Sequence, residues 1–83
     1  MKREAKLLST THDWYLGDNG IVRKTIRLVV IHGKYQVFIE DKTFDQFFRD
    51  VIDFKVETAN NLNEAKEIYK QAGGVLKSYE TLD

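Results

Sequence analysis

Two runs of β-branched and aromatic residues stand on either side of a glycine in the middle of the chain. The first run is Ile26–Ile31, the second is Tyr35–Glu40, and His32, Gly33 and Lys34 lie between them. Strand-forming runs that flank a glycine turn predict a β-hairpin.

The two faces of this hairpin are both apolar. Alternate side chains on a strand point to opposite faces. One face therefore carries a larger apolar set, which is Ile26, Leu28, Val30, Tyr35, Val37 and Ile39. The other face carries Val29, Ile31 and Phe38. A sheet with one solvated face alternates apolar and polar residues, so the second set predicts either a further layer of core or an interface.

The hairpin turn permits two registers that keep the same residues together. A loop at residues 32 and 33 sets Leu28 opposite Val37, whereas a loop at residues 33 and 34 sets Arg27 opposite Glu40. Opposite charges on facing residues stabilise a strand pair. We therefore favour the loop at residues 33 and 34.

A second turn signal precedes this hairpin. Gly17, Asp18, Asn19 and Gly20 form a cluster of turn residues in which Asn-Gly favours positive φ angles. The pattern predicts that a first strand ends near Leu16 and that the next begins near residue 21. Together with the central hairpin, these strands predict an N-terminal meander.

The segment after the hairpin has a helical period. Thr43 and Gln46 have the spacing of a capping box. The apolar residues that follow share one helical face: Phe44, Phe47, Phe48, Val51 and Ile52. We predict a helix over Phe44–Asp53, with Asp45, Arg49 and Asp53 as an ion-pair ladder on its outer side.

A second helix is predicted over Leu62–Ala72. Asn60 or Asn61 would cap its start, and Gly73 follows its end. Residues 55–59 fit either a short strand or an extended connector. The fold class predicted is α+β: a small antiparallel sheet of three to five strands, with two short C-terminal helices packed mainly on one face, in a single domain over residues 1–83.

Composition narrows the class of protein. The 83 residues have no cysteine, which excludes disulfides and thiolate chemistry and suits a reducing compartment. The longest apolar run, Leu28–Ile31, is too short to cross a bilayer, so we expect a cytoplasmic protein with no membrane partner. The net charge is zero, which makes a dedicated nucleic-acid binder less expected, although the first 35 residues are basic and the remainder is acidic.

Catalytic and cofactor motifs are missing from the sequence. There is no P-loop, no dinucleotide glycine fingerprint and no nucleophile elbow. His12 and His32, without any cysteine, make a poor zinc site. We therefore expect a non-enzymatic protein with no cofactor and no metal.

Three groups of residues are candidates for binding. The first is a protein-binding set, in which Trp and Tyr are typical anchors: Val29, Ile31, Phe38, Trp14 and Tyr15. Trp14 also fits a place in the core of so small a chain. The second group, Arg23, Lys24 and Arg27, would combine with these aromatics to hold a single-stranded nucleic acid.

The third group is acidic and could imitate a row of phosphates toward a nucleic-acid-binding partner. It consists of Asp41, Asp45, Asp50, Asp53 and Glu57. A solvated helix face, with Asp45 and Asp53 paired to Arg49, explains the same residues more simply, and we favour it.

The chain looks like the small inhibitors and regulators that bacteriophages and other mobile elements encode, anti-CRISPR proteins among them. The resemblance is one of size and element order, in a proline-free and cysteine-free chain with a hairpin, an acid-rich stretch and short helices. It implies a module that occupies the surface of a partner protein. A homodimer through the second sheet face is a further possibility, and the alternative functions are a nucleic-acid-binding module or an acidic nucleic-acid mimic.

Overall fold

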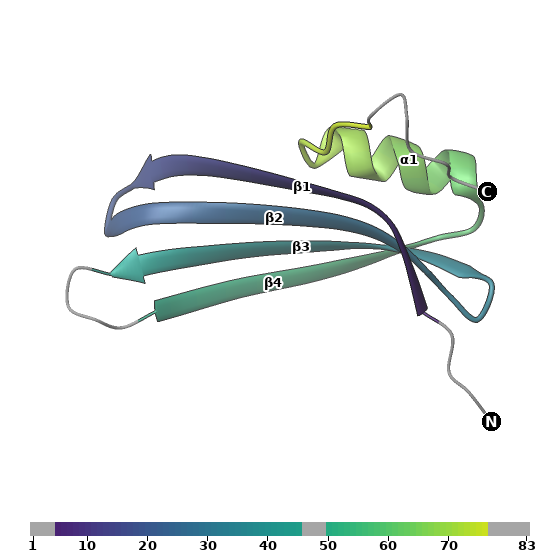
Figure 1. The fold of residues 1–83 in the computed structure, drawn as a ribbon, viewed down its shortest axis with the longest axis horizontal. Coiled ribbons are helices and arrows are strands. Elements are labelled where there is room, and N and C mark those ends of the chain that lie inside the picture. The colour runs from purple at the N-terminus through teal and green to yellow at the C-terminus, as the bar shows by residue number, and fades with distance from the viewer. Residues whose placement is uncertain (1–4, 46–49, 77–83) are drawn as a thin grey trace.

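Four antiparallel strands and one helix make up the computed structural model, which describes residues 5–45 and 50–76. The strands are β1 (Ala5–Gly17), β2 (Gly20–Ile31), β3 (Lys34–Asp45) and β4 (Asp50–Ala59), and the helix is α1 (Leu62–Gln71). Each strand pairs with the next in the chain, so the sheet order is β1-β2-β3-β4. The helix packs on one side of the sheet and covers only the end near the β2–β3 turn (Figure 1).

The predicted meander is confirmed, and so is the turn after Leu16. Gly17 pairs with Gly20 across a loop of Asp18 and Asn19. The positive φ angle of this turn falls on Gly20, at 141°, rather than on Asn19.

The central hairpin is confirmed, but the favoured register is wrong. Leu28 pairs with Val37, and the loop consists of His32 and Gly33. These two residues have φ angles of 52° and 77°. A two-residue loop with positive φ at both positions has the twist that antiparallel strands need, and histidine tolerates this region better than most residues. The turn geometry therefore outweighs the attraction between Arg27 and Glu40.

The predicted helix over Phe44–Asp53 is also wrong. Phe44 and Asp45 end β3, and residues 50–53 begin β4, which continues through the undecided segment 55–59 to Ala59. Phe47, Phe48 and Arg49 lie outside the described residues. Thr43 pairs with Val51, and Glu40 pairs with Phe54, so cross-strand pairing satisfies a backbone that a helix would have bonded internally.

The second predicted helix is confirmed. Asn61 is its N-cap, with the side-chain oxygen accepting a hydrogen bond from the Glu64 amide at 2.8 Å. Glu64 in turn accepts from the Asn60 amide at 3.2 Å. At the other end Gly73 has a φ angle of 104°, and the Gly74 amide donates to the Tyr69 carbonyl. These contacts satisfy backbone groups that a helix end leaves without partners.

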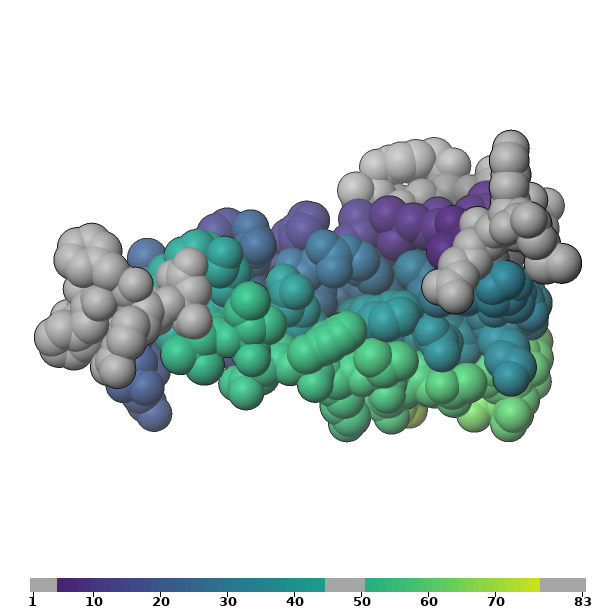
Figure 2. Space-filling view, turned by 90° about the horizontal axis from the view of Figure 1, so that it is seen from below, coloured from purple at the N-terminus to yellow at the C-terminus, as the bar shows by residue number. Residues whose placement is uncertain are grey.

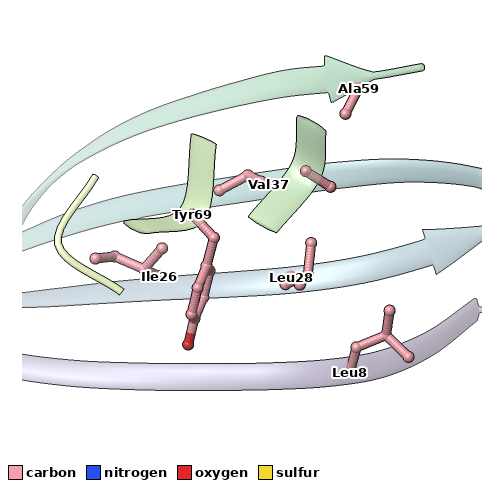
Figure 3. Close-up of a cluster of buried hydrophobic side chains, with 7 residues drawn as sticks. Leu8, Ile26, Leu28, Val37, Ala59 and Tyr69 are labelled. Atoms are coloured by element: carbon pink, nitrogen blue, oxygen red, sulfur yellow. The ribbon is translucent and has the colours of Figure 1, made fainter. Parts of the chain in front are cut away.

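The core lies between α1 and the sheet. Its buried members come from all five elements, with β1 contributing near its start: Leu8, Ile26, Leu28, Val37, Ala59, Ala65 and Tyr69. Figure 3 shows the Tyr69 ring reaching from the helix across Ile26 toward β1. The larger apolar face predicted for the hairpin is therefore the core face.

A β-bulge in β1 adds Leu8 to this core. The pairing of β1 with β2 shifts between Leu7 and Ser9, so both Leu8 and Ser9 are buried while Leu7 is exposed. A bulge places two residues of one strand opposite one residue of the other, which here is Leu28. No sequence signal marked this irregularity.

Candidate binding face of the sheet

The side of the sheet opposite α1 is left uncovered by the helix, and we call it the open face. Figure 2 shows the strands exposed side by side, from β1 in purple to β4 in green. The strand pairing assigns residues to this face in rows. One such row is Trp14, Arg23, Lys42 and Ile52, and another is Thr10, Arg27, Phe38 and Val56.

Strand β4 turns its apolar residues toward the open face. Ile52, Phe54 and Val56 lie there and are 56%, 55% and 44% exposed. The intervening Asp53 and Lys55 lie on the side that carries the helix. A monomer with one core buries the apolar set of each strand, so β4 has the reverse of the orientation expected.

Most of the large apolar side chains that are exposed within the described residues lie on this face. They are Leu7, Trp14, Leu16, Ile21, Ile52, Phe54 and Val56. So many exposed apolar side chains on one face are typical of an interaction site rather than of a solvated sheet.

A cluster of aromatic and cationic groups occupies the end of the open face near the β1–β2 turn. The rings of Trp14 and Phe44 stack with centroids 5.8 Å apart, across β2. The Arg23 guanidinium carbon lies 5.8 Å from both centroids, and the Lys42 ammonium lies 5.0 Å from that of Phe44. The Nε atom of Arg23 is buried without a hydrogen-bond partner among the described residues. The rings thus hold these cations by cation–π contact.

A second aromatic pair lies toward the other end of the face. Phe38 and Phe54 stack with centroids 5.7 Å apart. Phe38 also forms one wall of a groove of about 360 Å³. The groove is otherwise lined by Ala5, Lys6, Leu7, Arg27, Val29 and Ile31.

Charge is divided between the two sides of the sheet. Among the described side chains, the open face carries four cations against one acid: Arg23, Arg27, Lys34, Lys42 and Glu40. The uncovered part of the opposite side carries Asp13, Asp41 and Asp53 in one row with Lys24. The open face is therefore basic although the net charge of the chain is zero, and the acidic excess on the opposite side is confined to this row.

Tyr15 lies on the helix-bearing side of the sheet, close to Asp41 and Asp53, and not on the open face. Desolvation raises the pKa of its hydroxyl above 10.0, and the negative charge of Asp41, which accepts its hydrogen bond, raises it further, as does Asp53. Each of these effects disfavours the tyrosinate form.

The structure brings together only part of each predicted group. Trp14 shares the open face with Val29, Ile31 and Phe38, but Tyr15 points the other way. Arg23 and Arg27 share that face as well, whereas Lys24 does not.

The predicted acidic group is also divided. Asp41 and Asp53 face each other on the helix-bearing side, and Glu57 lies farther along β4 on that side. The side chains of Asp45 and Asp50 lie outside the described part of the structure. Asp41 and Asp53 carry like charges on directly opposite residues, and such a pair destabilises the contact between β3 and β4.

Sequence reasoning missed Lys42, Phe44, Ile52, Phe54 and Val56 as members of a site. A signal was present in the alternation of Ile52, Phe54 and Val56 with Asp53, Lys55 and Glu57, which is the period of a strand. The helical spacing of Phe44, Phe47, Phe48 and Val51 obscured it.

Within the described residues, no cluster of three or more His, Asp or Glu side chains is arranged to hold a metal ion. The one described helix falls short of the length and apolar character that a membrane span needs. No family model, curated protein or solved structure matches this chain.

Proposed function

We propose that the protein is a binding module that occupies the surface of a partner protein with its open face, in the manner of a small inhibitor or regulator. The reversed orientation of β4 carries the proposal. Ile52, Phe54 and Val56 are exposed on a face where the helix gives them no cover. Burying one such side chain against a partner stabilises the complex by about 1.5–3 kcal/mol before the costs of association.

The composition of the open face supports a protein partner. Aromatic residues and arginine are enriched at the centres of protein interfaces, and Trp14 with Arg23 and Phe44 forms such a group. The exposed aliphatic side chains of Leu16 and Ile21 need an apolar partner surface, which nucleic-acid phosphates and sugars do not offer.

The same face is poorly suited to pairing with a second copy. A face-to-face dimer would bring Arg23, Arg27 and Lys42 of both copies together against few acids. Like charges in an interface cost free energy, so the partner is a different protein with acidic groups. We expect light scattering to give the mass of a monomer.

The test uses two adjacent residues of β4. Ile52 lies on the open face and Val51 on the opposite side, and they are 56% and 51% exposed. Tagged wild-type protein, Ile52→Asp and Val51→Asp are used to capture partners from the native cell, with quantitative mass spectrometry. We expect a protein that wild type and Val51→Asp enrich equally and that Ile52→Asp loses at least about tenfold. Equal capture by both variants, or no enriched protein, would contradict the proposal.

A second candidate function is single-stranded nucleic-acid binding by the aromatic and cationic cluster. The observation in its favour is that Arg23 and Lys42 lie against the rings of Trp14 and Phe44, as in platforms that stack bases and neutralise phosphates. It predicts that oligo-dT binds at low salt, that affinity falls steeply as salt rises, and that Arg23→Gln weakens it. Absence of an anisotropy change at low salt would remove this candidate.

A further inference from the structure

The groove beside Phe38 has a composition that points to a particular kind of ligand. Its walls are mainly apolar, from Leu7, Val29, Ile31 and Phe38. Arg27 supplies the cationic side chain, since Lys6 pairs with Val30 of the core face and its side chain points away from the groove, and no acidic residue belongs to the lining. A ligand that satisfies both features must combine an apolar body with a negative charge.

The register of β2 and β3 places the Arg27 guanidinium next to the apolar wall of the groove. Arg27 on β2 pairs with Phe38 on β3, so its guanidinium lies at the rim of the groove rather than at a distant edge. Arg27 is exposed, which leaves its donors accessible to a ligand. A guanidinium binds a carboxylate with two parallel hydrogen bonds.

Thr10 provides a second polar group beside Arg27, next to the groove rather than in its lining. It pairs with Arg27 from the β1 side. Its hydroxyl oxygen is buried and has no hydrogen-bond partner among the described residues. Buried hydroxyl groups are normally hydrogen-bonded, so a carboxylate held by Arg27 would offer Thr10 an acceptor after rotation of its side chain.

The groove is also continuous with the proposed interface. Phe38 forms its wall and stacks on Phe54, which belongs to the apolar row of β4. A free small molecule would fill the groove alone, whereas a protein segment would extend from the groove along Phe54. This continuity favours a peptide.

We propose that the groove binds a segment of the partner protein in which a large apolar side chain stands next to Asp or Glu. The apolar side chain packs between Val29, Ile31 and Phe38, and Arg27 holds the carboxylate. This inference rests on the proposed function and names the chemistry of the partner's contact segment.

The test measures binding of three blocked hexapeptides by amide chemical shifts in the full chain. The peptides are DEFLDE, its basic counterpart KKFLKK, and DESSDE, which lacks the apolar residues. We expect only DEFLDE to bind, with shifts at Leu7, Arg27, Val29 and Ile31 and with a Kd on the order of 1 mM, as for a short segment.

Variants then separate the groove from the rest of the open face. Arg27→Gln should weaken DEFLDE about threefold to tenfold, while Lys34→Gln, which removes an exposed cation outside the groove lining, should leave it unchanged. Val29→Glu should abolish it, and amide spectra of each variant establish that it is folded.

Several results would overturn this inference. They are equal binding of DEFLDE and KKFLKK, shifts confined to residues outside the groove, an unchanged affinity of Arg27→Gln, or tighter binding of decanoate or oligo-dT than of DEFLDE. Failure of the proposed function looks different, because it is measured as equal partner capture by Ile52→Asp and Val51→Asp, two residues outside the groove.

Discussion

The hydroxyl group of Tyr69 on α1 lies 3.0 Å from the hydroxyl oxygen of Ser9 on β1 and also bonds to that of Thr11. Thr11 in turn accepts a hydrogen bond from the Val75 amide at 2.9 Å. Helix α1 and the segment after it are thus bonded to β1. The Tyr69 side chain is fully buried, so its bond to Ser9 lies inside the core between α1 and the sheet.

Removal of this hydroxyl should destabilise the protein without changing its fold. Tyr69→Phe removes the hydrogen bonds to Ser9 and Thr11, and each bond of this kind contributes about 0.5–1.5 kcal/mol to the free energy of unfolding. Urea unfolding measures the loss, and Tyr35→Phe at a half-buried position is the matched control. Equal midpoints for the two variants would show that the hydrogen bonds to Ser9 and Thr11 contribute little.

The two sides of the sheet should differ sharply in their contribution to stability. Ile26 is 1% exposed in the core and Ile52 is 56% exposed on the open face. Ile26→Ala should cost about 2–5 kcal/mol, whereas Ile52→Ala should stay within about 0.5 kcal/mol. The comparison uses one residue type and one substitution, with thermal or urea unfolding as the measurement. A large loss at Ile52 would mean that the open face is covered within the free protein.

Gly74 should tolerate no larger residue while Tyr69 is present. A Cβ atom built on Gly74 would lie 2.5 Å from two carbons of the Tyr69 ring. Gly74→Ala therefore forces the ring to move, at a cost of about 1–3 kcal/mol or more.

A double-mutant cycle identifies this clash. The cost of Gly74→Ala should fall when Tyr69 is already replaced by Leu, because the obstructing ring is then gone. Gly33→Ala is the control, since its cost arises from a φ angle of 77° with no atom within 4 Å and should be independent of Tyr69. Additive effects of Gly74→Ala and Tyr69→Leu would contradict the clash.

Tyr15 should ionise at a higher pH than an ordinary tyrosine. Desolvation, followed by the charges of Asp41 and Asp53, raises the pKa of its hydroxyl in the folded protein above 10.0. The folded state then holds the proton longer than the unfolded state does. The stability from this group is complete below pH 10.0 and is lost as pH rises through the folded-state pKa.

Tyrosinate absorbance measures this ionisation as the difference between wild type and Tyr15→Phe. Asp41→Asn should move the Tyr15 transition back toward lower pH, because it removes the acceptor's negative charge. A Tyr15 transition that Asp41→Asn leaves unchanged would show that the carboxylate has no part in the shift.

Much of the fold could be predicted from local chemistry. Turn residues at 17–20 and the Asn61 and Gly73 ends of α1 act within a few residues, and each is confirmed. The segment around Phe44 could not be assigned by the same means, because its apolar residues satisfy a helical period while Ile52, Phe54 and Val56 satisfy a strand period. Pairing with β2 and β3, which is non-local, decides between them.

The candidate site was harder to predict than the fold. Which face Trp14 occupies depends only on alternation, but its partner Phe44 lies thirty positions away on a strand that was predicted as a helix. The apolar pattern predicted a cover on both sides of the sheet, whereas the single helix within residues 5–45 and 50–76 covers one side, and this leaves the open face.

The meander with its helix at the end has a consequence for synthesis of the chain. Each strand pairs with the strand made just before it, so the sheet can form while translation continues. Tyr69, which closes the core and bonds to Ser9, emerges only after all four strands have been made. Until then both sides of the nascent sheet carry uncovered apolar residues, so a chain stalled before α1 is a target for chaperones and proteases, and α1 relieves this on one side only.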